Sequence, residues 1–406
     1  MIMFVKKSFF AVPLFLFGGL FAGAVTAAPV PAKAPEAVKA PAPVKAPDLR
    51  LLLPEKIYAV PGVETNIYFN NIVTVINPAN YVFDVTCPKG RNDLKRWRFT
   101  PTAKDKGTYK WSIRIICPNG AVVQGEAQLI VLPADAGAQK DITMLIVGAS
   151  QTGAGHYADR IADLMARPGN PKFKTIGSKG RRGKHEGYGG WRWDSFLTRW
   201  GYTNSREMDG MHPDRPVGFN SPFLFPDKNG KGVFDLQKYL DKHNNGKAPD
   251  VVSFQLGLND FFNSTDETIA AVTERSISNM EKLIAEFRKL KPAPELMIFQ
   301  HIPGANQDAF GQNYQCGQTS WQYRKNLDYY NRALLKKGKE LKLHVVPIYM
   351  NIDTENNFPT RLQPVNEGNP KKILRANNGV HPAQPGYYQM GDTLYCYLKA
   401  ILNNKK

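Results

Sequence analysis

The stretch Ile142-Thr143-Met144-Leu145-Ile146-Val147-Gly148-Ala149-Ser150 is an almost continuous apolar run that ends in two small residues and a serine. Such a run predicts a buried strand of a parallel sheet. A helix is predicted soon after it, from Tyr157 to Ala166. Ser150 should therefore stand at a strand-to-helix turn, where its hydroxyl can project from the edge of the sheet beside a helix N-terminus that favours negative charge.

The same pattern, a buried strand followed by an amphipathic helix, repeats through the rest of the chain. Strands are predicted at Val251–Leu256, Leu296–Phe299 and His344–Ile348, and helices at about Glu267–Leu290, Tyr323–Leu341 and Gln384–Leu402. This alternation indicates an α/β domain, which we place at residues 140–406, with helices on both faces of a parallel sheet. Sites in such sheets form outside the carboxyl ends of the strands. Ser150, Asn259 and the loop that carries His381 all fall at that end.

The N-terminal segment is predicted to be a signal peptide, residues 1–27. Lys6 and Lys7 precede an apolar run from Phe9 to Val25, and Ala27 ends a small-residue cleavage site. The alternative is an uncleaved membrane anchor, but a run of about 17 residues is at the short end for crossing a bilayer. We therefore expect a periplasmic or secreted protein. Residues 28–50, rich in Pro, Ala and Lys, are expected to form an extended linker.

Residues 51–135 are predicted to form a separate, all-β domain. Short segments rich in β-branched and aromatic residues, such as Tyr81–Val85, alternate with turn pairs that contain glycine or proline. This spacing is typical of a β-sandwich, and we expect one of immunoglobulin-like type. The segment Asp105-Lys106-Gly107-Thr108-Tyr109 resembles the tyrosine corner of such sandwiches.

The four cysteines indicate disulfide bonds if the protein is exported. Cys87 and Cys117 fall in the β domain, and Cys316 and Cys396 fall in the α/β domain. Pairing within each domain is the simplest of the three possible arrangements, and the spacing does not choose among them.

The chain is strongly basic. Its formal net charge is +18, and loss of Lys6 and Lys7 with the signal peptide would leave +16. For an exported protein this charge favours anionic partners such as acidic polysaccharide, cell-wall material or a membrane surface over nucleic acid, and a solvated basic surface with no specific partner is the alternative.

Four short motifs in the α/β domain supply groups that ester cleavage needs. They are Gly148-Ala149-Ser150, Gly189-Gly190, Gly257-Leu258-Asn259-Asp260 and Asn378-Gly379-Val380-His381. Ser150 can act as a nucleophile, and its N–H, the Gly190 N–H and the Asn259 amide can bind an oxyanion. His381 is the best candidate for the base, with His185 as its competitor. The glycine-rich run from Gly148 to Gly155 does not have the spacing of a dinucleotide or phosphate loop.

Taken together, the four motifs resemble those of the SGNH, or GDSL-like, hydrolases, over roughly Asp141 to Leu402. The resemblance implies a flavodoxin-like, three-layer α/β/α fold and esterase activity without a metal or other cofactor. It also implies that Ser150 is the nucleophile, that Ser150, Gly190 and Asn259 form the oxyanion hole, and that His381 is the base. Asp260 is expected to anchor its loop or to cap the helix that follows.

Two positions depart from the family pattern, and both lack a carboxylate. Ala149 replaces the aspartate beside the nucleophile, and Asn378 stands where the family has the acid that orients the histidine. Three solutions are open: a backbone carbonyl could orient His381, another carboxylate such as Asp353 or Glu367 could take the role, or deamidation of Asn378 before Gly379 could create an aspartate.

The segment from Lys172 to Arg199 is basic and contains Trp191, Arg192 and Trp193 beside Gly190. Exposed indoles stack on sugar rings, so we expect these three residues to contact substrate, unless the tryptophans belong to the core. We predict a serine esterase that removes O-acyl groups, above all O-acetyl, from a carbohydrate. The alternatives are a catalytically degenerate carbohydrate-binding or surface-interaction protein, and a lipid or thioester hydrolase.

Overall fold

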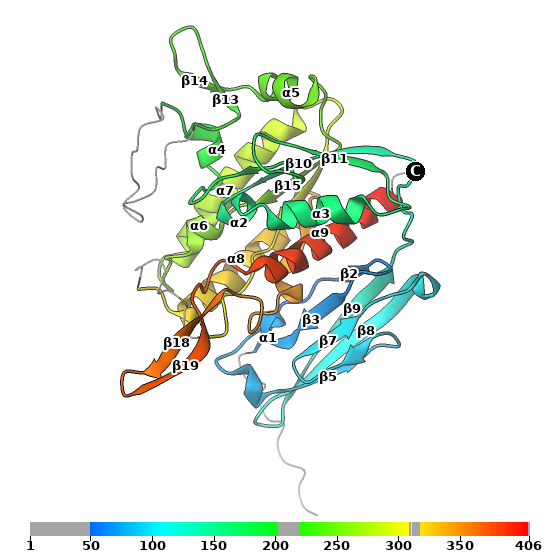
Figure 1. Ribbon diagram of the computed structural model, residues 1–406, viewed down its shortest axis with the longest axis vertical. Helices are drawn as coiled ribbons and strands as arrows, with labels where there is room; N and C mark the ends of the chain where they lie inside the picture. Colours follow the sequence, from blue (N-terminus) through cyan, green and yellow to red (C-terminus); the bar gives the residue numbers. More distant parts are fainter. Residues whose placement is uncertain (1–48, 202–219, 308–309, 311–316, 405–406) are drawn as a thin grey trace, which may run out of the picture. The chain divides into compact units, whose positions relative to one another are not determined.

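A parallel sheet forms the centre of the α/β domain in the computed structural model, which describes residues 49–201, 220–307, 310 and 317–404 (Figure 1). Its strands lie in the order β11-β10-β15-β16-β17, and the short β12 pairs with the end of β10. Numbered along the chain this order is 2-1-3-4-5, the flavodoxin-like order. The strands are β10 (Asp141–Gly148), β11 (Lys172–Ile176), β12 (Glu186–Gly187), β15 (Val251–Gln255), β16 (Glu295–Phe299) and β17 (His344–Val346). The predicted parallel sheet is confirmed.

Helices cover both faces of this sheet, because alternate side chains of its strands point to opposite sides. Along β10, Met144 and Ile146 pack in one core with α3 and α9, whereas Leu145 and Val147 pack in a second core with α5, α7 and α8. The two helix layers are visible on either side of the strands in Figure 1. Their bounds are α3 (His156–Met165), α5 (Leu236–Asn244), α7 (Ile269–Arg288), α8 (Ser320–Glu340) and α9 (Gln384–Asn404).

Several short elements connect these layers, and two of them are hairpins that the sequence did not lead us to expect. The second hairpin pairs Leu362 with Leu374, both well exposed, and ends directly before the loop that carries His381. The connecting elements are α2 (Ser150–Gly153), α4 (Ser195–Thr198), β13 (Leu224–Pro226), β14 (Gly232–Phe234), α6 (Leu258–Phe261), η4 (Ile348–Asn351), β18 (Thr360–Asn366) and β19 (Asn369–Ala376).

Residues 50–131 form the predicted β structure as two small sheets, with strand orders β2-β9-β8-β5 and β3-β7-β6, and a short β1–β4 pair. Trp97 on β7 meets Trp111 on β8 edge to face, with ring centroids 6.2 Å apart. The Tyr109 hydroxyl donates to the Asp105 carbonyl at 3.0 Å. The immunoglobulin-like type remains a prediction. The elements are β1 (Arg50–Leu51), β2 (Lys56–Ala59), β3 (Thr65–Tyr68), α1 (Phe69–Ile72), β4 (Val73–Thr74), η1 (Pro78–Asn80), β5 (Val82–Thr86), β6 (Arg91–Asn92), β7 (Arg96–Phe99), η2 (Ala103–Asp105), β8 (Gly107–Ile116) and β9 (Val122–Val131).

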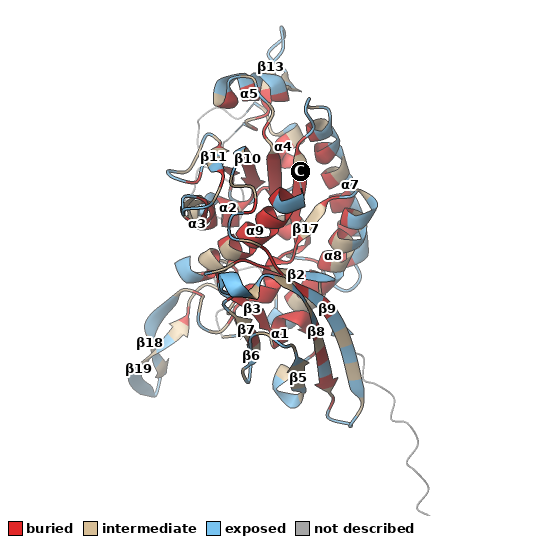
Figure 2. Ribbon diagram, turned by 90° about the vertical axis from the view of Figure 1, so that its right-hand side faces the viewer, coloured by how far each residue is buried: buried red, intermediate tan, exposed pale blue. Residues whose placement is uncertain are grey.

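The core of this β region is continuous with the core of the α/β domain. Buried residues of β2 and β8, such as Ile57 and Trp111, belong to the same apolar cluster as Tyr349 of η4 and Leu398 of α9. Figure 2 shows buried residues running from the strands of the β region into the helices above them. All described residues belong to one compact unit. The boundaries that we place at residues 135 and 140 remain predictions.

The predicted disulfide between Cys87 and Cys117 is wrong. Both are free thiols, because β5 and β8 pair antiparallel in a register that matches Thr86 with Ser112, which leaves the two cysteines at opposite ends of the strand pair. That separation is roughly 20 Å, far beyond the reach of a disulfide. Cys396 is also a free thiol, buried in α9. Its predicted partner Cys316 lies outside the described residues.

Residues 1–48, with the predicted signal peptide and most of the linker, also lie outside the described part of the chain. Within the described part, no helix is both long and apolar enough to cross a membrane. The periplasmic or secreted location remains a prediction.

Candidate active site

The structure brings Ser150 and His381 together. Ser150 is the first residue of α2, directly beyond the end of β10, and His381 lies in the loop between β19 and α9. The Nε2 atom of His381 is 2.7 Å from the Oγ atom of Ser150. This distance is within the range that allows a histidine to take a proton from a hydroxyl.

Close backbone packing sets the position of Ser150. The Ala149 N–H donates to the carbonyl of Gln255 at 3.2 Å, which ties the turn to the end of β15. A Cβ atom placed on Gly187 of β12 would collide with the backbone of α2 at Gly153. Only glycine therefore allows β12 and α2 to approach each other this closely.

Side-chain hydrogen bonds hold the loop of His381. The Oδ1 atom of Asn378 accepts from the N–H groups of Val380 and His381, both at 2.9 Å. At the far end of the loop the Ala383 N–H donates to the carbonyl of Asn357 at 2.9 Å. Asn378, which stands where an acid was expected, thus uses its side-chain oxygen on the backbone of the loop.

A buried polar network links the turn that carries Ser150 to the loop that carries His381. Gln151, next to Ser150, donates through Nε2 to the Val380 carbonyl, next to His381, at 3.2 Å. Gln255 in turn donates through Nε2 to Gln151 Oε1 at 2.7 Å. The turn of Ser150 and the loop of His381 are therefore also joined by buried hydrogen bonds between their neighbouring residues.

His301 extends this network beyond Gln255. Its Nδ1 lies 3.4 Å from Gln255 Nε2, and its Nε2 lies 3.0 Å from the Leu256 carbonyl. Complete burial lowers the pKa of His301 to about 4, so the ring is neutral at physiological pH. We assign the proton to Nε2, because the carbonyl can only accept. Sequence reasoning missed Gln151, Gln255 and His301, although a glutamine in an otherwise apolar strand is a signal, since burying it is costly unless it is hydrogen bonded.

The two predicted oxyanion donors outside the nucleophile turn lie on segments that contact each other. Gly190 has φ +74°, a conformation that favours glycine, and the Tyr188 N–H near it donates to the Gly148 carbonyl at 3.1 Å. Asn259 of α6 donates through Nδ2 to the Trp191 carbonyl at 2.9 Å. An amide group carries two N–H bonds, and this contact uses one of them. Their role as oxyanion donors remains a prediction.

Asp260, directly after Asn259, has an unusual environment. Its Oδ2 has no hydrogen-bond partner among the described residues. Burial raises the pKa of Asp260 to about 7; Asp194 raises it further, whereas a hydrogen bond from Ser276 and the charges of Arg192 and Arg275 oppose the rise. Burial therefore favours the neutral form of this carboxyl.

The predicted substrate contacts of Trp191 and Trp193 are wrong, because each indole is only 1% exposed. Trp191 stacks on Tyr188 with ring centroids 4.1 Å apart, and Trp193 donates through Nε1 to the Tyr330 hydroxyl at 3.1 Å. Both tryptophans belong to the core. Arg192 between them is exposed, and its Nε donates to the Asn259 carbonyl at 3.1 Å.

The competing base, His185, and the two alternative acids, Asp353 and Glu367, have surroundings of their own. His185 is buried, its Nδ1 accepts from the Gly187 N–H at 3.2 Å, and burial lowers its pKa to about 4. Asp353 Oδ1 accepts from two backbone N–H groups of its own loop, and Glu367 is exposed on the hairpin between β18 and β19. Asp353 is thus engaged by its own loop and Glu367 lies on the exposed hairpin, and the group that orients His381 remains a prediction.

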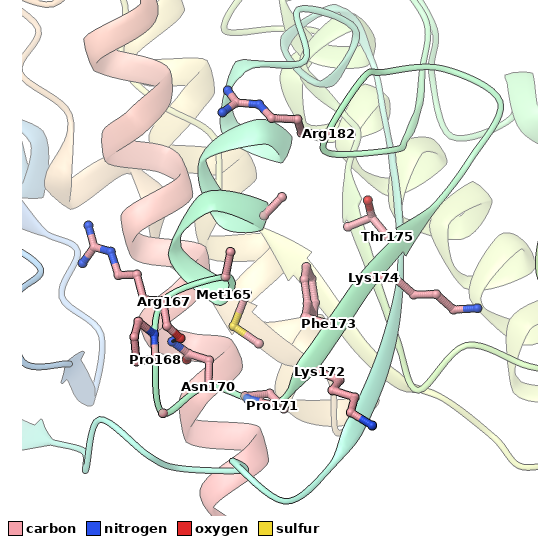
Figure 3. A pocket seen from close by; sticks show the side chains of 13 residues that line it. Met165, Arg167, Pro168, Asn170, Pro171, Lys172, Phe173, Lys174, Thr175 and Arg182 are labelled. Carbon is pink, nitrogen blue, oxygen red and sulfur yellow. Dashed lines mark hydrogen bonds between the residues drawn. The ribbon is translucent and has the colours of Figure 1, made fainter.

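A cavity of about 310 Å³ lies elsewhere, between α3 and β11. Phe173 faces α3 across it, whereas Lys172 and Lys174 point to the other side of β11 (Figure 3). Lys172 pairs with Asp141 at the start of β10, and Ser150 follows the end of that strand. The cavity therefore lies toward the amino ends of the strands, whereas Ser150 follows the carboxyl end of β10. The side chains of Lys172 and Lys174 do not point into it.

Comparison with known proteins identifies the family. The model of the GDSL-like lipase/acylhydrolase family matches residues 140–394. No curated protein matches. Similar solved structures include a family 3 carbohydrate esterase of Clostridium thermocellum (18% identity, 65% of this chain and 98% of that chain, TM-score 0.38). They also include a family 3 carbohydrate esterase from Talaromyces cellulolyticus (13%, 65% and 100%, 0.36) and a carbohydrate acetylesterase, Est24, from Sinorhizobium meliloti (13%, 64% and 100%, 0.37). The family match covers well over half of the chain, which therefore belongs to the GDSL-like lipase/acylhydrolases.

Proposed function

We propose that the protein is a serine esterase that removes O-acyl groups, above all O-acetyl groups, from a carbohydrate. The observation that carries this proposal is the 2.7 Å contact between Ser150 Oγ and His381 Nε2, at the carboxyl edge of the sheet of a GDSL-like acylhydrolase. A hydroxyl and an imidazole at this distance form the nucleophile–base pair that ester cleavage through a covalent intermediate requires.

In the proposed reaction, Ser150 Oγ attacks the ester carbonyl while its proton moves to His381 Nε2. The carbonyl oxygen becomes an oxyanion that accepts from the N–H groups of Ser150 and Gly190 and from the Asn259 amide. The bond between the acyl carbon and the sugar oxygen then breaks, and that oxygen takes the proton from His381. Water attacks the acyl carbon and gives a proton to His381; the bond between that carbon and Ser150 Oγ then breaks, Oγ takes the proton from His381, and the carboxylic acid leaves.

Asn378 has a defined part in this proposal, although it is not an acid. Its oxygen holds the N–H groups of Val380 and His381, so it shapes the backbone from which the imidazole projects. Those two hydrogen bonds need an acceptor oxygen, and that oxygen does not have to be charged. This arrangement supports the solution in which His381 works without an aspartate at position 378.

The substrate class rests on charge and predicted export. Arg192 is exposed, and its guanidinium contacts the carbonyl of Asn259, whose side chain is a proposed oxyanion donor. A cation at this position, on a chain of formal net charge +18, favours an acylated glycan that carries carboxylate groups. The N-terminal segment, if it directs export, would bring the enzyme to such polymers.

The test is hydrolysis of 4-nitrophenyl acetate by the wild type and by Ser150→Ala, His381→Ala and Asn259→Ala. The first two changes should each lower kcat by roughly 10⁴-fold or more, because the pair acts as a unit. The third should lower it roughly 10²- to 10³-fold, as loss of one oxyanion donor does. Ser112→Ala, at a half-buried position of β8 whose hydroxyl donates to the Thr86 carbonyl, is the matched control and should leave turnover unchanged.

Acetate release from acetylated acidic and neutral glycans then tests the substrate class. Faster release from the acidic glycan, with the preference lost in Arg192→Ala, would support the proposal. A preference for longer acyl chains in a series of nitrophenyl esters would point instead to a lipid hydrolase. No Ser150-dependent turnover in folded protein that binds saccharide would favour the degenerate binding protein, an alternative motivated by the loss of both carboxylates, at Ala149 and Asn378.

A further inference from the structure

A short stretch of the β region, residues 66–71, is hydrogen bonded along its length to the segment that follows β17. We call residues 349–357 the clamp segment. The backbone N–H and the Nδ2 of Asn66 both donate to Asn351 Oδ1, at 2.9 and 3.0 Å. The Nδ2 of Asn71 donates to two carbonyls of the clamp segment, those of Tyr349 and Ile352, at 2.8 and 2.7 Å.

These contacts are shielded from water. Asn66 is 3% exposed and Asn351 is 2% exposed, and the two Asn71 bonds are buried as well. A buried amide that loses its partner is not compensated by solvent, so the loss of such a hydrogen bond is costly. Two part-buried bonds extend the contact: Tyr68 Oη to Asp353 Oδ2 at 3.3 Å, and Asn70 Nδ2 to Thr354 Oγ1 at 3.2 Å. The β region therefore fixes the clamp segment at several consecutive points.

The clamp segment in turn holds the loop of His381. The carbonyl of Asn357 accepts from the N–H of Ala383, two residues after His381, at 2.9 Å. Gln389 of α9 ties the segment down, because its Oε1 accepts from the Asp353 N–H and from Asn357 Nδ2, both at 2.9 Å. A Cβ atom at Gly386 would lie 2.7 Å from the Asn357 carbonyl, so the first turn of α9 is packed directly on this residue.

A second route reaches the same loop through residues 305–307. The N–H of Asn306 donates to the Thr354 carbonyl at 2.9 Å, and Gln307 Nε2 donates to the Glu355 carbonyl at 2.9 Å. Gln307 Oε1 accepts from the Ala376 N–H at 3.0 Å, at the start of the His381 loop. Next to it, the Ala305 N–H donates to the carbonyl of Gly379 at 2.9 Å. Both routes start at the clamp segment and end on either side of His381.

We infer that the N-terminal β region positions His381 for catalysis, and that Asn66 and Asn71 are positioning residues that act through the clamp segment. The inference rests on the proposed function, because it gives His381 the role of base. On this inference the β region contributes to the chemistry of a site that none of its residues contacts. A displacement of about 1 Å between reacting groups can cost roughly 10²-fold in rate.

The test compares Asn71→Ala and the milder Tyr68→Phe with Tyr109→Phe. Tyr109→Phe is a matched control, because it removes a hydroxyl of the same β region whose bond, to the Asp105 carbonyl, does not reach the clamp segment. Two readouts are taken: hydrogen exchange of the peptides that cover residues 349–357 and 377–383, and the separate values of kcat and KM for 4-nitrophenyl acetate. Asn71→Ala should speed exchange in both peptides and lower kcat roughly tenfold to hundredfold, with KM within about twofold. Tyr68→Phe should do the same more weakly, and the control should do neither.

Two results would overturn the inference. One is faster exchange in residues 349–357 with unchanged exchange in residues 377–383, which would show that the clamp segment does not hold the His381 loop. The other is an unchanged kcat in a variant whose His381 loop does exchange faster. If Asn71→Ala does not fold, Tyr68→Phe alone decides between these outcomes. Failure of the proposed function is distinguishable, because it appears as absence of Ser150-dependent turnover in the wild type, and hydrogen exchange still decides whether the β region holds the loop.

Discussion

The turn that carries Ser150 is held by close backbone packing, whereas the loop that carries His381 is held by hydrogen bonds, several of which come from side chains. At the turn, strands β10, β12 and β15 end side by side, and glycines let α2 pack on β12 without intervening side chains. At the loop, Asn378 supplies an acceptor for two N–H groups, and Gln151 donates to the carbonyl of Val380. The turn should therefore be sensitive to added volume, and the loop to lost hydrogen-bonding groups.

The largest effect is expected from added volume at the turn. In Gly187→Ala the new methyl group would meet the backbone of Gly153, which cannot move without shifting α2 and Ser150. Overpacking of this kind typically costs about 1–3 kcal/mol of folding free energy, and esterase activity should fall with it. Denaturant unfolding and nitrophenyl acetate hydrolysis measure the two effects.

Gly153→Ala is the matched control for this change. A Cβ atom at Gly153 would lie 3.3 Å from the Gly187 carbonyl, a tight contact that a small shift can relieve. It should cost much less than Gly187→Ala. Equal losses in the two variants would mean that the turn is not held by the close approach of β12 and α2.

A smaller effect is expected from loss of an acceptor in the loop. Asn378→Ala removes the oxygen that two N–H groups share, so the loop should loosen and kcat should fall roughly tenfold, the equivalent of about 1.4 kcal/mol. Asn378→Asp keeps the acceptor and should stay close to wild type. If the aspartate variant is instead far more active than wild type, position 378 acts through charge, and the contrast between turn and loop needs revision.

The smallest effect is expected at Asp260 of α6, which belongs to neither the turn nor the loop. Its pKa in the folded protein is about 7, above the ordinary value of 3.8, so folding favours the neutral carboxyl. The stability it contributes is fully present below its unfolded pKa and is lost as the pH rises through about 7. Asp194, Arg192, Arg275 and Ser276 are the groups that face it.

Asp260→Asn should therefore gain thermal stability relative to wild type as the pH is raised from about 5 to about 8. The measurement is the difference in Tm between the two proteins at each pH. A difference that does not change with pH would show that the carboxyl has the same charge throughout. Because Asp260 lies outside the loop of His381, the kcat of the variant should keep the pH dependence of the wild type.

Much of the α/β architecture was predictable, because the spacing of apolar residues and the length of the apolar runs distinguish its strands from its helices. The runs at Ile142–Val147, Val251–Leu256 and Leu296–Phe299 all form strands of the parallel sheet, as their composition indicates. The hairpin of β18 and β19 was not foreseen, because its residues are mostly exposed and its alternation of apolar residues is weak. The register of β5 against β8 could not be predicted from the sequence either. The wrong disulfide between Cys87 and Cys117 follows from this.

At the site, the order of the motifs along the chain was enough to predict that Ser150 and His381 meet, while their catalytic roles remain predictions. Composition could not tell an exposed indole from a buried one, which is why Trp191 and Trp193 were misplaced. The buried link through Gln151 was missed, because its partner is a backbone carbonyl that leaves no trace in the sequence.

The separation of Ser150 and His381 along the chain has a consequence for the timing of activity. The two residues are 231 positions apart, and α9, which follows His381, packs against α3, which follows Ser150, with Arg160 Nε bonded to Asp392 Oδ1 at 2.7 Å. During synthesis the serine therefore emerges from the ribosome long before the histidine. A nascent or truncated chain that ends before His381 therefore carries the proposed nucleophile without its proposed base. On the proposed mechanism, ester cleavage begins only once both ends of the α/β domain have docked.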